Sequence, residues 1–108
     1  MNPIRVLLAD DEEELVATLA ERLEIRGFAV KWVTTVTAAC DILQDDVFDV
    51  AVLDVKLPGM SGPVLKRRMA RIAPRLKFIF MTGHGSADSF KECAAEAGSS
   101  YFLMKPIN

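Results

Sequence analysis

The sequence lacks any long apolar run. None of its 108 residues lies in a stretch approaching the ~20 apolar residues that a membrane-spanning helix needs. The segment from Met1 to Leu8 holds one Arg and a very short apolar run, so it lacks the layout of a signal peptide. Cysteine is scarce, with only Cys40 and Cys93, both in Ala-rich stretches that resemble helices. These absences predict a cytoplasmic chain without membrane contact, whose thiols are reduced and buried.

An excess of positive charge is also missing, because 13 basic and 15 acidic residues give a net charge of -2. Direct binding of nucleic acid by this segment is therefore not expected. No Gly-x-x-x-x-Gly-Lys motif is present, which excludes a P-loop nucleotide site. What the chain does have is 51% hydrophobic and 26% charged residues, enough apolar material for one packed domain spanning residues 1–108.

Apolar, strand-like runs alternate with amphipathic helical stretches along the whole chain. The predicted strands are Ile4–Ala9, Phe28–Val33, Val47–Leu53, Leu76–Met81 and Tyr101–Met104. The predicted helices are Glu12–Arg26, Thr35–Leu43, a segment from Pro63 that ends before Pro74, and Ser86–Ala97. Continuous apolar strands separated by helices indicate a parallel sheet covered on both faces. With right-handed crossovers, the leading topology is a doubly wound α/β domain.

Polar residues follow four of the five predicted strands, where such folds form their sites. Asp10 and Asp11 come after the first strand, Asp54 after the third, Thr82 after the fourth and Lys105 after the fifth. Three carboxylates at one sheet edge repel one another and require compensating positive charge. A hard divalent cation such as Mg2+, together with a lysine, supplies it. Such a pocket suits phosphoryl transfer to a carboxylate nucleophile, which forms an acyl phosphate.

These residues resemble the receiver domain of bacterial two-component response regulators. The resemblance rests on Asp10-Asp11, on the segment Asp54-Val-Lys-Leu-Pro-Gly-Met-Ser-Gly62, on Thr82-Gly83 and on Lys105-Pro106. It covers the whole chain, with the motifs in the family's order and spacing. It implies a flavodoxin-like sheet of five parallel strands in the order 2-1-3-4-5.

The resemblance also implies a role for each matching residue. Asp54 would accept a phosphoryl group from the phosphohistidine of a histidine kinase or a histidine phosphotransfer protein. Mg2+ or Mn2+ would be bound by Asp11, Asp54 and the backbone carbonyl of Lys56, with Asp10 contributing through a water molecule. The phosphoryl oxygens would be contacted by three further residues, Thr82, Gly83 and Lys105.

The same resemblance implies a conformational switch. Thr82 would move toward the phosphate and Phe102 would rotate inward, changing the surface of the fourth helix and fifth strand. Tyr101, the adjacent aromatic residue, is the alternative candidate for this switch. The peptide bond between Lys105 and Pro106 would be cis. The chain would be a signalling domain and not an enzyme, assisting only its own phosphorylation and dephosphorylation.

Plainer interpretations stand beside these roles. Asp10 and Asp11 are also suitable helix caps, with Asp11 at the N-cap. Asp54 alone could be a loop residue, Lys105 alone a surface lysine, and Thr82 a turn cap. His84 is interpreted as exposed rather than as a metal ligand. The cations of the third helix form either a solvated face or a contact with another domain; they are Lys66, Arg67, Arg68 and Arg71.

The sequence departs from the family's pattern at Ser61, at Tyr101 and at its end. The chain stops at Asn108, where relatives continue into a fifth helix. The fifth helix is therefore missing or truncated, and we expect an effector domain beyond Asn108, or a homodimer or domain swap that covers the exposed sheet face. The alternative function is that of a degenerate receiver, acting as an interaction or dimerisation module independent of phosphorylation.

Overall fold

The computed structural model describes residues 2–54, 62–82 and 101–104, with side chains described for 2–54 and 64–81. Five parallel strands form one sheet in the order β2-β1-β3-β4-β5. The strands are β1 (Arg5–Ala9), β2 (Ala29–Val33), β3 (Val50–Asp54), β4 (Lys77–Thr82) and β5 (Tyr101–Met104). The helices are α1 (Glu13–Ile25), α2 (Val36–Asp45) and α3 (Gly62–Ile72). The predicted doubly wound sheet and its strand order are confirmed.

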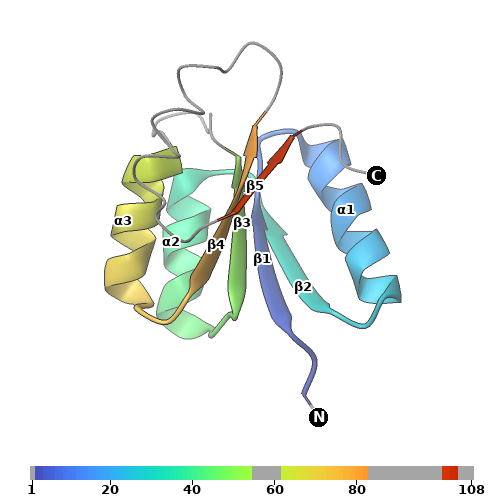
Figure 1. Ribbon diagram of the computed structural model, residues 1–108, viewed down its shortest axis with the longest axis horizontal. Coiled ribbons are helices and arrows are strands. Elements are labelled where there is room, and N and C mark those ends of the chain that lie inside the picture. Colours follow the sequence, from blue (N-terminus) through green and yellow to red (C-terminus); the bar gives the residue numbers. More distant parts are fainter. Residues whose placement is uncertain (1, 55–61, 83–100, 105–108) are drawn as a thin grey trace.

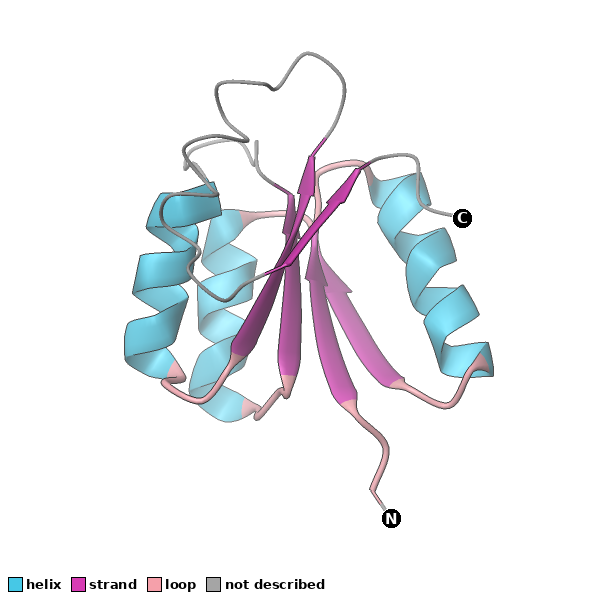
Figure 2. Cartoon of the chain, viewed as in Figure 1, coloured by secondary structure: helices cyan, strands magenta, loops and turns pink. Residues whose placement is uncertain are grey.

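The helices cover the two faces of the sheet, as Figures 1 and 2 show. Helices α2 and α3 lie on one face and contribute Leu43, Leu65 and Met69 to one half of the core. Helix α1 lies on the other face and contributes Val16 and Ala20 to the second half. Alternate residues of the strands point into the two halves, as the two-residue period of a strand requires. Because all the strands are parallel, their carboxyl ends lie at the same edge of the sheet.

Helix α1 ends at Ile25, with Arg26 as its C-cap, and Gly27 follows as the stop that the sequence predicts. This glycine has a φ of +97°, a backbone conformation that is energetically unfavourable for residues other than glycine. The Gly27 N–H donates to the Glu24 carbonyl at 3.0 Å, and the Phe28 N–H donates to the Leu23 carbonyl at 3.1 Å. These two bonds form a Schellman motif, which satisfies the last carbonyls of the helix. The turn reverses the chain so that β2 can pair beside β1.

The prediction for the third strand is wrong at its amino end. The apolar run begins at Val47, but β3 begins at Val50, and Val47 is 75% exposed. Phe48 is buried in the core, while the guanidinium of Arg5 lies 5.2 Å from the centre of its ring. Apolar character alone does not distinguish a strand from a loop residue that packs against the core.

The predicted fourth helix, Ser86–Ala97, lies outside the described residues, as does Cys93. Cys40 is a free, half-buried thiol, and burial raises its pKa, although the charge of Arg68 works against that shift. Among the described helices, none has the length and apolar character required to span a bilayer.

Candidate functional site

The pairing of β1 with β3 brings together carboxylates that are far apart in the sequence. The two strands are parallel and in register, with Ala9 opposite Leu53. Asp10 is the next residue after Ala9, and Asp54 is the last residue of β3. Both carboxylates therefore lie at the carboxyl edge of the sheet, as the strand-end pattern predicts.

Asp10, Asp11 and Asp54 form one cluster. Each offers a carboxylate oxygen, and these oxygens all lie within 4.8 Å of one another. Asp10 is fully buried and Asp54 is 7% exposed, whereas Asp11 is exposed to solvent. The cluster thus combines two buried carboxylates with one that is exposed to solvent.

The backbone around Asp10 holds its carboxylate in place. Its N–H donates to the Val33 carbonyl at 3.2 Å, which ties the end of β1 to the end of β2. Its Oδ1 accepts a hydrogen bond from the Glu12 N–H at 2.9 Å. The sequence analysis missed this role of the Glu12 backbone, although an Asp two residues before a donor N–H is a known turn signature.

The structure is also informative about the capping alternative. The N-cap residue of α1 is Glu12, and its side chain makes no capping hydrogen bond. The interpretation of Asp11 as the N-cap is therefore wrong. Asp11 instead precedes the helix and places its carboxylate within the cluster.

At this separation the three carboxylates could not all stay ionised unless positive charge compensated their mutual repulsion. Their donor set consists of oxygens only, which is the set that Mg2+ and other hard divalent cations prefer. Two oxygens bound directly to one Mg2+ are at most about 4.2 Å apart, since each bond is about 2.1 Å. The observed limit of 4.8 Å is close to that value, so the residues fit such an ion after a small adjustment or with one water-mediated ligand.

The remaining predicted site residues are described in part or not at all. Thr82 ends β4, the strand next to β3, where Asp54 is paired with Met81. Phe102 and Tyr101 lie in β5, opposite Phe80 and Ile79 of β4. The side chains of these three residues are not described. A further set lies outside the described residues: Lys56, Gly83, His84, Lys105 and Pro106.

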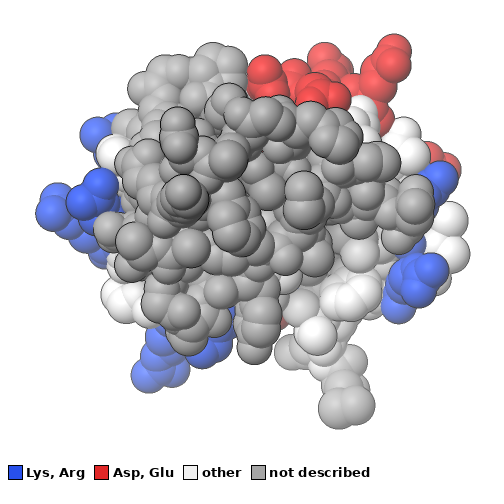
Figure 3. Space-filling view, turned by 45° about the horizontal axis from the view of Figure 1, so that its top comes forward, with Lys and Arg blue, Asp and Glu red and all other residues white. Residues whose placement is uncertain are grey.

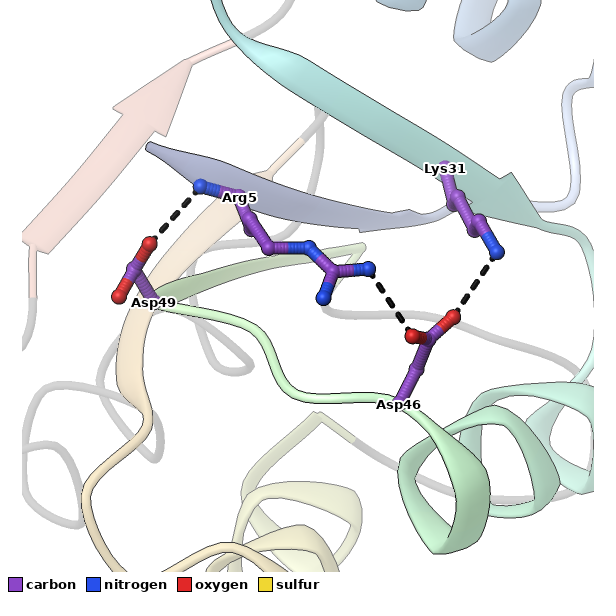
Figure 4. A network of polar contacts seen from close by, with 4 residues as sticks. All are labelled: Arg5, Lys31, Asp46 and Asp49. Carbon is purple, nitrogen blue, oxygen red and sulfur yellow. Dashed lines mark hydrogen bonds and ion pairs between the residues drawn. The ribbon is translucent and has the colours of Figure 1, made fainter. Parts of the chain in front are cut away.

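A second group of charged side chains lies between β1, β2 and the end of α2 (Figure 4). Asp46 accepts hydrogen bonds from Lys31 at 2.8 Å and from Arg5 at 2.9 Å. Both bonds hold the pKa of Asp46 below its usual value, and the bond from Lys31 has the larger effect. Asp49 accepts a hydrogen bond from the Arg5 N–H at 2.8 Å. The charges of this group compensate one another, so we assign it a structural role.

Comparison with known proteins agrees with the geometry. A family model described as the response regulator receiver domain matches residues 6–108. The transcriptional regulatory protein FixJ of Rhizobium meliloti is 35% identical over 107 residues, which is 99% of this chain and 52% of FixJ. The C4-dicarboxylate transport transcriptional regulatory protein DctD of the same organism is 33% identical over 102 residues, covering 94% of this chain and 22% of DctD.

A solved structure with the same fold is that of a response regulator from Burkholderia pseudomallei with a phosphorylated aspartic acid, a calcium ion and citrate. It superimposes with a TM-score of 0.85 at 28% identity, covering 97% of this chain and 61% of that one. This chain thus spans about a fifth of the length of DctD and about half of the length of FixJ.

Proposed function

This chain belongs to the response regulator receiver domain family, and from that membership we propose that Asp54 is a phosphoacceptor whose phosphorylation depends on a divalent cation. The observation that carries the proposal is the clustering of three carboxylates from two strand ends within 4.8 Å. A receiver domain is a signalling domain, so the proposed reaction alters the protein itself and not a released product.

Among the three carboxylates, Asp54 is best suited to be the nucleophile. Asp10 is fully buried and its Oδ1 is already engaged by the Glu12 N–H. Asp11 is the exposed member of the cluster, which suits it to bind a cation from solution. Asp54 is held at the end of a paired strand and is slightly more exposed than Asp10, at 7% against 0%.

Asp11, Asp54 and the backbone carbonyl of Lys56 would hold Mg2+ or Mn2+, with Asp10 acting through a water molecule. When bound, the ion neutralises negative charge on the pocket and on the incoming phosphoryl oxygens. Thr82, Gly83 and Lys105 are proposed to contact those oxygens. The chain's own contribution is the fixed placement of the nucleophile and of the opposing charges.

In the proposed step, a carboxylate oxygen of Asp54 attacks the phosphorus of a phosphohistidine on a partner. The new O–P bond forms as the P–N bond breaks, and the bonding electrons remain with the imidazole, which then takes a proton. The product is an aspartyl phosphate. Water later attacks the same phosphorus and returns the carboxylate and inorganic phosphate, which resets the domain.

The signal is proposed to pass through Thr82 and Phe102. Thr82 is the last residue of β4, and Phe102 lies on the adjacent β5. A change at the phosphorylated end of β3 would therefore reach β5 by crossing a single strand. The rotation of Phe102, with Tyr101 as the other candidate, and the cis bond between Lys105 and Pro106 belong to this proposal.

The partners are proposed to be a histidine kinase or a histidine phosphotransfer protein, together with an output domain. The relatives support the output domain, because they are named as transcriptional regulators and extend well beyond the matched segment. The mutual orientation of the two domains would be the property that phosphorylation changes. A cytoplasmic location follows from such partners and remains part of the proposal.

The proposal is tested by incubation with acetyl phosphate, with and without Mg2+, followed by intact-mass measurement and peptide mapping. We expect one added phosphoryl group per chain, at Asp54, only when Mg2+ is present. Asp54→Asn should prevent labelling, and Asp41→Asn, which alters an exposed carboxylate on α2, should not. If no labelling occurs under any condition in the folded wild type, the domain is a phosphorylation-independent interaction module.

A further inference from the structure

Two segments of this chain each carry charge of one sign only. Six of the 13 Lys and Arg residues fall within residues 62–82, a segment without Asp or Glu. Five carboxylates occupy the consecutive positions 10–14. The basic segment includes α3 and the acidic one leads into α1, and these helices cover opposite faces of the sheet (Figure 1). The molecule therefore has a strongly uneven charge distribution despite its small net charge.

The basic segment presents a continuous stripe of guanidinium groups to solvent. Leu65 and Met69 of α3 are fully buried. Arg67, Arg68 and Arg71, which we call the basic stripe, are all exposed on the other side of the helix. Residues three and four positions apart are neighbours on a helix surface, so these like charges repel one another. Neither Arg68 nor Arg71 takes part in an ion pair with a described carboxylate.

The acidic segment is exposed as well. Asp11, Glu12, Glu13 and Glu14, which we call the acidic turn, all have high solvent exposure. In the space-filling view of Figure 3, carboxylates gather at the upper right, and Lys and Arg side chains stand out on the left, the side on which α3 lies, and also at the right edge. The basic stripe lies on α3 and the acidic turn leads into α1, and these helices cover opposite faces of the sheet, so the two groups do not pair within one chain. They are complementary only between two copies.

We propose that the basic stripe of one copy binds the acidic turn of a second copy. Arginine suits this contact because its planar guanidinium can bond a carboxylate through two hydrogen bonds. The contact joins two different surfaces, so each added copy leaves one stripe and one turn open. Association is therefore head to tail and extends with concentration. It does not require phosphorylation at Asp54, although Asp11 belongs both to the acidic turn and to the carboxylate cluster.

A second copy fits the stripe better than a nucleic acid does. The chain has a net charge of -2, so its overall field opposes a long polyanion, whereas the acidic turn offers a compact set of carboxylates matched to a short stripe. Exposed ion pairs are individually weak and are screened by salt. The association is accordingly weak, and it decreases steeply as the ionic strength rises.

The test is sedimentation velocity of the full chain in EDTA, at salt concentrations of about 20 mM and about 500 mM, where screening differs strongly. EDTA removes divalent cations that would alter the charge of Asp11. We expect the average mass to rise with protein concentration at low salt and to equal that of a monomer at high salt. Arg68→Gln with Arg71→Gln should lower the association constant about tenfold or more, as should Glu13→Gln with Glu14→Gln.

A matched control is available at the end of α1. Arg22 and Arg26 are exposed, and Arg22 occupies the last turn of its helix, as Arg71 does in α3. Changing both to Gln alters net charge equally and should leave association within about threefold of wild type. Thermal melts followed by circular dichroism establish that each variant is folded.

Mixing the two variants gives the most specific readout. The stripe variant retains a turn and the turn variant retains a stripe, so an equimolar mixture should form heterodimers that cannot extend, while neither alone associates. Absence of heterodimers between folded variants would overturn the proposal, as would wild-type association that does not change with salt. Binding of a DNA duplex by a strictly monomeric wild type would also overturn it and assign the stripe to nucleic acid.

Discussion

The carboxylates of Asp10 and Asp54 meet because Ala9 and Leu53, the residues before them, are paired across two parallel strands. A separation of forty-four positions in the sequence is thereby reduced to a contact across less than 4.8 Å. The sheet keeps both groups in place when they repel each other, since the register of a buried strand is strongly specified. The site is therefore pre-formed by the fold.

A divalent cation is expected to stabilise this protein. Binding relieves the mutual repulsion of Asp10, Asp11 and Asp54, and a ligand at ten times its Kd raises the free energy of unfolding by about 1.4 kcal/mol. Urea denaturation at increasing Mg2+ should show a saturating increase. Asp11→Asn should weaken the effect, whereas Asp45→Asn, on the exposed end of α2, should not. An equal Mg2+ effect in both variants would place the ion elsewhere.

Gly27 is expected to resist substitution for reasons of backbone conformation alone. A Cβ added there would have no heavy atom within 4 Å, yet its φ is +97°. Gly27→Ala should therefore lower the free energy of unfolding by about 1 kcal/mol, and Gly27→Asn by less, because Asn tolerates this region better. Denaturant titrations of the two variants measure the difference. Equal stability of wild type and Gly27→Ala would contradict the Schellman ending of α1.

Thr35 is expected to stabilise α2 through its hydroxyl. Its Oγ1 accepts a hydrogen bond from the Ala38 N–H at 3.1 Å at the start of the helix. Thr35→Ala removes this cap and should lower the free energy of unfolding by about 1 kcal/mol. Thr35→Ser retains the acceptor and should cost much less. If the Ser and Ala variants lose the same stability, the hydroxyl is not the stabilising group.

Asp46 is expected to make stability depend on pH in the acid range. Hydrogen bonds from Lys31 and then Arg5 lower its pKa in the folded protein, relative to about 3.9 when unfolded. The folded state therefore binds the proton less readily, so the contribution is complete above about pH 4 and is lost as the pH falls through the folded pKa. Unfolding of wild type and Asp46→Asn at several pH values should show a difference that shrinks in acid. Asp45→Asn is the matched control, and a difference that grows in acid would refute the assignment.

The strand ends show which part of the site was predictable from the sequence. Asp10, Asp11 and Asp54 each follow an apolar run, and parallel strands necessarily present their carboxyl ends together, so their meeting required no structure. The backbone interactions were less accessible. The residue type of Glu12 does not indicate that its N–H bonds Asp10. The N-cap position considered for Asp11 is occupied by Glu12, whose side chain makes no capping hydrogen bond.

The start of β3 shows the limit of periodicity as evidence. Val47 and Phe48 extend the apolar run, but neither belongs to the strand. Phe48 is buried beneath Arg5, and Val47 is exposed, because the pairing of Arg5 with Asp49 sets where the strand begins. Strand pairing is a tertiary property, and a pattern within one segment does not contain it.

The central claim is that Asp10, Asp11 and Asp54 form one cation site, and paramagnetic broadening by Mn2+ tests it most directly. In amide NMR spectra, substoichiometric Mn2+ should first broaden signals of residues 10–12 and 53–54, and Mg2+ should restore them by competition. Signals of Arg5 and Lys31, which lie beside the compensated Asp46, should persist. Broadening centred on another group of carboxylates, or broadening unchanged by Asp11→Asn, would contradict the account.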